Sequence, residues 1–222
     1  MTQALSDAAR RGIVQHFSSR AAGELTTSIA FEHLADDLNR QVGCADLAKQ
    51  ARRFQQDELR HSKICEEIAA RYSSEVLPPT RPRGTRPYVL PSASDEDQRI
   101  LRTVFGCCFG ETIAVQWLTD AHRACTDPEA RAENRQHLAD EVHHSRLGWA
   151  YLGLGVLSKR DKQMIASYLP LMCERSLKSW AHNDTPTPTG IEAFGCPDEE
   201  ATARSVERAI NEVILPGFQL VL

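Results

Sequence analysis

A glutamate stands near the middle of each of four long stripes of apolar and small residues. These stripes repeat every three or four residues, as the buried face of a helix does, within 6–40, 44–73, 95–125 and 127–153. The four glutamates are Glu24, Glu58, Glu111 and Glu141. Burying a carboxylate without a partner costs more free energy than a fold can supply. The pattern therefore predicts four helices around one interior, where the carboxylates share a counter-charge.

The four helices form two pairs joined by one long connection. A short turn containing Gly43 links the first pair, and Asp127-Pro128 caps the start of the fourth helix. Residues 78–91 are rich in proline and arginine and cannot form a helix interior. Two hairpins joined by one crossover make the ferritin-like version of the four-helix bundle. We expect an all-α chain with one ferritin-like domain over 1–222 and bundle helices at about 6–155.

Beyond the bundle, the pattern predicts two additional C-terminal helices at about 158–215 that cover one end or side of it. The first should kink at Pro170, because proline removes a helix hydrogen bond. A loop rich in proline and threonine follows at 183–190, and Pro197 opens the last helix, which we expect to stop before Pro216.

Composition disfavours several classes of protein. The formal net charge of -4 gives no basic field for nucleic acid. No uncharged run approaches the roughly 20 residues that span a bilayer, and the N-terminus lacks the apolar segment of a signal peptide. The seven cysteines include no Cys-x-x-Cys pair. We therefore expect a cytoplasmic protein without disulfides or a Cys-ligated iron centre.

Two of the glutamates belong to Glu-x-x-His motifs, Glu58 to His61 and Glu141 to His144. Residues three apart share a helix face, so each pair can reach one site. Two such motifs with one glutamate from each of two other helices are the ligand set of di-iron bundles. We expect these six residues to be the metal ligands and the catalytic residues: Glu24, Glu58, His61, Glu111, Glu141 and His144.

The charges indicate the metal. Two Fe(II) ions balance four carboxylates, and oxygen and nitrogen ligands without thiolate suit iron or manganese. We predict two iron ions, and a mixed manganese/iron pair stays open.

In the first helix Glu32 is the alternative ligand, but it lies one residue off the stripe, whereas Glu24 lies on it. We expect the substrate pocket beside the metals, lined by Ser28, Phe31, Ala114, Val115 and Leu118.

The motif itself resembles a known group. Residues 57–61 match the Asp-Glu-x-Arg-His motif of bacterial di-iron oxygenases and fatty-acyl desaturases, and 140–144 is a near copy with histidine in place of the arginine. The resemblance covers roughly 10–155. It implies that Asp57 orients His144 and that Asp140 orients His61, each by a hydrogen bond to the ligand histidine.

A further histidine narrows the resemblance. His137 lies four residues before Glu141, and this spacing looks like the p-aminobenzoate N-oxygenase family, in which the extra histidine is a seventh iron ligand. The equally weighted alternative is that His137 binds no metal and is a core histidine or one that hydrogen-bonds to a carboxylate. The resemblance implies an O2-dependent oxygenase that acts on a small organic substrate, by N-oxygenation of an amine or by hydroxylation, with electrons from an external donor.

Three other functions use a similar bundle. Iron oxidation and storage of the bacterioferritin type is the first, and peroxide scavenging of the rubrerythrin type is the second. Hydroxylation of tRNA is disfavoured by the acidic net charge. The sequence leaves a homodimer open.

Overall fold

The computed structural model describes residues 5–84, 88–181 and 190–222, and every regular element in these ranges is helical. Helices α1 (Asp7–Asn39) and α2 (Ala45–Tyr72) pack against each other as an antiparallel pair. Gly43 lies in the turn between them with φ of 82°, a left-handed conformation that glycine adopts without strain. The predicted first pair of helices is therefore confirmed.

The third predicted helix is continuous but not uniform. It consists of α3 (Asp95–Thr103), a π-helical segment η1 (Val104–Glu111) and α4 (Thr112–Ala124). The Oγ of Ser94 accepts from the backbone of Asp97 and caps its start. The predicted bounds are close, but the π turn was not expected. Such turns occur often at functional sites, and this one ends at Glu111.

Helix α5 (Pro128–Gly153) begins where the sequence predicts, because the Asp127 carboxylate accepts from the backbone of Ala130. It approaches η1 closely at Gly148. A Cβ there would lie 2.6 Å from Sγ and 2.8 Å from the backbone nitrogen of Cys108. Only glycine allows the two helices to approach to this distance.

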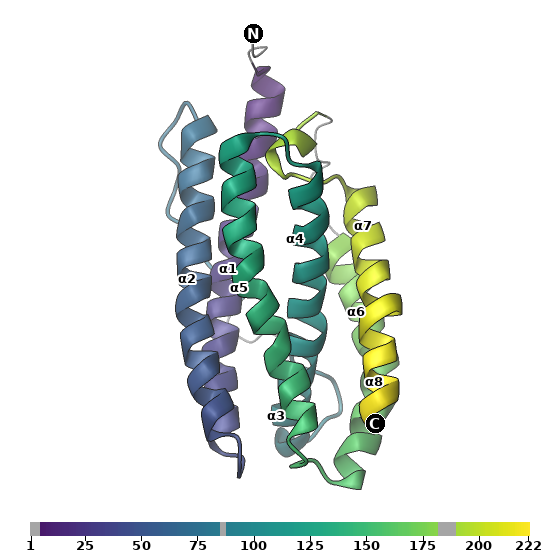
Figure 1. Ribbon diagram of the computed structural model, residues 1–222. Helices are drawn as coiled ribbons and strands as arrows, with labels where there is room; N and C mark the ends of the chain where they lie inside the picture. Colours follow the sequence, from purple (N-terminus) through teal and green to yellow (C-terminus); the bar gives the residue numbers. More distant parts are fainter. Residues whose placement is uncertain (1–4, 85–87, 182–189) are drawn as a thin grey trace.

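The C-terminal part forms a further layer. Helix α6 (Lys159–Ala181) and the segment α7 (Glu199–Arg208), η3 (Ala209–Ile214) and α8 (Leu215–Val221) lie on the side of α4 away from α2 (Figure 1). A short 3-10 turn, η2 (Glu192–Phe194), precedes α7. These helices cover one side of the molecule, as predicted. Most of the predicted loop at 183–190 lies outside the described residues.

Two predicted details of this layer are wrong. The last helix is capped by Asp198, not opened by Pro197, because the Asp198 side chain accepts from the backbone of Ala201. The helical path also continues past Pro216 to Val221. The π-helical η3 ends at Ile214, two residues before this proline. Its wider turn spares the carbonyl that would otherwise meet the proline ring. Helix α6 runs through Pro170.

Two apolar clusters lie at different levels of the molecule. One contains Ile13, Phe17 and Ile68, and the other contains Phe31, Leu34 and Ala51. Along both α1 and α2, the stretch between these levels carries buried polar side chains instead. No helix in the described ranges has the length and apolar character needed to cross a membrane.

Candidate metal centre

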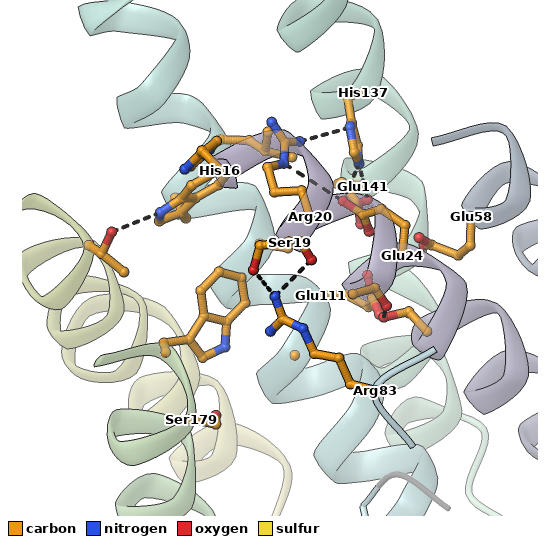
Figure 2. Close-up of a pocket in the computed structure, with 18 of the residues that line it drawn as sticks. His16, Ser19, Arg20, Glu24, Glu58, Arg83, Glu111, His137, Glu141 and Ser179 are labelled. Carbon is orange, nitrogen blue, oxygen red and sulfur yellow. Dashed lines mark hydrogen bonds and ion pairs between the residues drawn. The ribbon is translucent and has the colours of Figure 1, made fainter. Parts of the chain in front are cut away.

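Seven predicted residues come together in the polar stretch between the two apolar clusters. They form two groups that share Glu141, and within each group one ligand atom per residue lies within 4.8 Å of the others. The first group is Glu24, His61, His137 and Glu141, and the second is Glu58, Glu111, Glu141 and His144. All are buried except Glu24, whose side chain is 17% exposed. Figure 2 shows the four carboxylates and His137 converging on one end of a cavity.

Several atoms that face the interior have no hydrogen-bond partner among the described residues. They are both carboxylate oxygens of Glu58, one of Glu141, and Nδ1 of His61 and of His144. Nδ1 of His144 lies 2.9 Å from Glu58 and 3.3 Å from Glu141, and Nδ1 of His61 lies 3.4 Å from Glu141. Buried polar atoms without partners are costly. Convergent oxygen and imidazole donors of this kind fit divalent iron or manganese.

The other ring nitrogens of these histidines face outward. Nε2 of His61 lies 3.1 Å from Asp140, and Nε2 of His144 lies 3.3 Å from Asp57. These are the two pairings that the motif resemblance implies. Each aspartate holds a ring proton on Nε2, so Nδ1 is the nitrogen that would bind a metal once the metal displaces its proton.

One arginine joins the two aspartates. The guanidinium of Arg60 donates to Asp57 and to Asp140, both over 2.8 Å. Arg60 belongs to the first motif, and the second motif has His143 at the equivalent position. A single forked side chain therefore serves both halves of the site, which the separate motifs did not reveal.

Charge in the cluster is balanced without a metal. Burial raises the pKa of Glu24 to about 8, with the neighbouring Glu58 adding to the shift, and burial together with Glu141 holds the pKa of Glu111 well above its usual value. Burial also disfavours ionisation of Glu58 and Glu141, but the close imidazoles outweigh it and lower the pKa of both. Two neutral and two ionised carboxyl groups result.

The same contacts keep two imidazoles charged. Burial favours neutral rings, but the close carboxylates of Glu141 and Glu58 outweigh it and raise the pKa of His61 to about 10 and that of His144 to about 12. Two imidazolium groups therefore balance the two ionised carboxylates. A pair of divalent ions can replace four protons, those on these two rings and on Glu24 and Glu111, without a change in net charge.

His137 differs from the other two histidines. Burial lowers its pKa to about 4, so the ring is neutral. Arg20 lies 3.0 Å from its Nδ1, and because arginine has only donors, Nδ1 must accept. The proton then sits on Nε2, which lies 3.1 Å from Glu141 and 3.4 Å from Glu24. In this arrangement His137 donates to the carboxylates, as in the alternative to a metal ligand.

The alternative ligand in α1 lies elsewhere. Glu32 is half exposed and lies 3.8 Å from Arg52, and it belongs to neither group of potential ligands. The choice of Glu24 from the helical stripe therefore agrees with the geometry.

A cavity of about 660 Å³ opens from the carboxylates toward α6 and α7. Glu24, Glu58, Glu111 and Glu141 stand at one end of it, and Arg83 and Ser19 stand further along (Figure 2). Trp117 and Trp180 line it as well. Its donors and aromatic rings suit a small organic molecule with a polar group.

The five predicted pocket residues do not all line the same cavity. Ala114 and Leu118 line this cavity, and Phe31 lines a second cavity of about 450 Å³. Ser28 and Val115 line neither of these two cavities. The Ser28 hydroxyl turns back to the carbonyl of Leu25, and Val115 is displaced from Ala114 by one step around the helix.

Sequence reasoning missed three residues of this region. Arg20 lies four residues before Glu24 and so shares its helix face, which was the available signal. Arg60 stands inside the motif but was not given a contact. Tyr88 lines both cavities, and its position in the connection between α2 and α3 carries no periodic signal.

Comparisons with protein-family models, with curated proteins and with solved structures find no match to this chain.

Proposed function

We propose that this chain is a ferritin-like four-helix-bundle protein that binds two iron ions and uses O2 to oxidise a small organic substrate. The observation that carries the proposal is the buried cluster of four glutamates and three histidines, in two groups joined by Glu141. One glutamate from each of two helices and a Glu-x-x-His motif from each of two others make up the ligand set of di-iron bundles.

The ligands follow from the geometry. Glu24, His61 and Glu141 would hold one ion, with His137 as a fourth ligand if its ring exchanges its proton. Glu58, Glu111, Glu141 and His144 would hold the other. Bound iron supplies redox chemistry with O2, and an external donor supplies the electrons. A mixed manganese/iron pair fits the same donors.

The chain's own residues prepare the site for this chemistry. Asp57 and Asp140 orient the two histidines, and Arg60 holds both aspartates. Phe54 and Phe31 pack against the His144 ring, with centroids 4.3 Å and 5.4 Å away. These rings cover one side of His144, and a ligand would reach the carboxylates through the larger cavity.

The cavity favours an oxygenase over the other functions. Its volume of about 660 Å³ lies within the range of small-molecule sites. The cavity reaches all four glutamates of the cluster. Iron storage or peroxide scavenging has no need of such a chamber. We propose N-oxygenation of an amine as the reaction, with hydroxylation as the second choice.

The test begins with metal-free protein loaded with Fe(II) under nitrogen. We expect two irons per chain, and after O2 is added, single-turnover oxidation of an amine such as aniline, followed by mass spectrometry with ¹⁸O2. Iron bound without oxygen transfer, with continued oxidation of excess Fe(II), would indicate a ferroxidase. Binding of no iron would contradict the proposal as a whole.

Matched variants of α1 sharpen this test. Glu24→Gln removes one donor from the first group and should lower the iron count from two toward one. Glu32→Gln, on the same helix but paired only with Arg52, should bind iron as the unmodified protein does. Equal losses in both variants would indicate that the geometry of the cluster does not determine iron binding.

A further inference from the structure

The two cavities meet along α1. The larger cavity is lined by residues of α1 from Gly12 to Thr27, and the smaller one by residues from Thr27 to Arg40. Three residues line both: Thr27, Tyr88 and Glu111. The boundary between the two cavities therefore lies directly beside a predicted metal ligand.

The ring of Tyr88 lies against two glycines of η1 at this boundary. A Cβ on Gly106 would lie 3.4 Å from the ring, and a Cβ on Gly110 would lie 2.9 Å from the hydroxyl. Gly106 lines the smaller cavity and Gly110 lines the larger one. Phe105 packs edge-on against the same ring at 5.2 Å between centroids. The ring thus spans the π-helical segment between the two chambers.

The backbone holds this ring in an unusual conformation. Tyr88 has φ of 62°, which is rare for an aromatic residue and persists only where its surroundings impose it. The residues that follow are held by side chains of two helices. Arg175 donates to the carbonyl of Val89, Gln98 accepts from the backbone of Leu90, and Tyr168 donates to the carbonyl of Pro91. Such strain, held by so many contacts, is typical of functional positions.

We propose that Tyr88 is a partition that determines substrate size, because its ring closes the larger cavity beside Glu111 and excludes ligands long enough to enter the smaller one. The inference rests on the proposed oxygenase function and specifies its substrate as a compact amine that fits the larger chamber alone. Tyr88 acts through the volume of its ring, and its hydroxyl has no part in the selection.

The test compares ring removal with hydroxyl removal. Tyr88→Gly removes the ring, and glycine adopts the same positive φ without strain. Tyr88→Phe keeps the ring and is the matched control. Tyr88→Asn is a second ring-deleted variant, since asparagine also tolerates this conformation. The probes are aniline, 4-butylaniline and 4-octylaniline, titrated calorimetrically into metal-free protein.

We expect the unmodified protein and Tyr88→Phe to bind 4-octylaniline less tightly than 4-butylaniline. Both ring-deleted variants should bind 4-octylaniline about tenfold more tightly than the unmodified protein does, because the second chamber then buries the chain. Their affinity for aniline should stay within about twofold, since aniline needs only the larger chamber.

Two results would overturn the partition. One is an affinity that depends on the alkyl chain length of the probe in the same way in all four proteins, including the case in which none of them binds the probes. The other is a gain by Tyr88→Phe equal to that of Tyr88→Gly, which would assign the effect to the hydroxyl. Calorimetry uses metal-free protein, so these results are independent of iron loading, on which the proposed function depends.

Discussion

Arg20 donates a hydrogen bond to Nδ1 of His137 across 3.0 Å and so decides which ring nitrogen carries the proton. With the proton on Nε2, the lone pair that a metal would need is occupied. A metal on Nε2 would move the proton to Nδ1, where it would face the donors of Arg20. Whether His137 becomes a ligand therefore depends on Arg20.

The first prediction concerns a variant that reverses the direction of the hydrogen bond at Nδ1 of His137. In Arg20→Gln, an amide oxygen can accept from Nδ1–H, which frees Nε2 for the metal. We expect this variant to bind one of the two Fe(II) ions about tenfold more tightly, measured by anaerobic titration. Arg20→Lys keeps a donor at this position and should not show the gain. A gain of the same size in both variants would indicate that His137 is not controlled in this way.

The second prediction concerns protons released on metal binding. At pH 7 the metal-free cluster holds a proton on each of four groups, because the pKa of each is raised: Glu24, His61, Glu111 and His144. Metal binding must displace these protons, so the apparent affinity should rise with pH from 6 to 8 and about four protons should leave per pair of ions. Calorimetry in buffers of different ionisation enthalpy measures this number. Release of one proton or fewer would contradict the charge assignment.

The third prediction tests the aspartates outside the ligand set. Asp140→Asn keeps an acceptor for His61 but removes the charge that faces both His61 and Arg60. Metal affinity should fall about 10–100-fold, measured by competition with a chelator. Asp46→Asn is the control, because Asp46 is exposed and pairs only with Lys49 within its own helix turn. Unchanged affinity in Asp140→Asn would indicate that the aspartate does not orient the ligand.

The fourth prediction concerns the close packing of α5 on η1. Gly148→Ala places a methyl group 2.6 Å from Sγ of Cys108 and 2.8 Å from its backbone nitrogen. We expect the free energy of unfolding to fall by about 1–3 kcal/mol, measured by denaturant titration. Gly153→Ala, in the same helix, meets no atom within 4 Å and should be neutral or stabilising by about 0.5–1 kcal/mol. Equal changes in the free energy of unfolding in both variants would mean that the close contact with Cys108 does not cause the destabilisation.

The helical stripes predict much of the site because helix geometry converts sequence spacing into a shared face. Glu58 and His61 lie three residues apart, so one turn brings both to the interior, and the stripe through α1 selects Glu24 over Glu32. The same spacing, together with the capping residues Ser6 and Asp127, accounts for the starts of α1 and α5. It does not account for the π turn in η1, because that turn depends on packing against helices from other parts of the chain.

What the sequence by itself determined is therefore local: an all-helical chain, the ends of its long helices, and the faces that carry the glutamates and histidines. Only the tertiary structure decided which residues meet across helices. Arg60 contacts Asp57 in its own helix and Asp140, which lies 80 residues beyond Arg60 in the chain. Arg20 reaches His137 across 117 residues. Tyr88 lies between two cavities because the irregular connection crosses η1 at its glycines. Such contacts depend on how helices pack and on where a non-periodic segment runs, and neither is encoded in the spacing of residues along one helix.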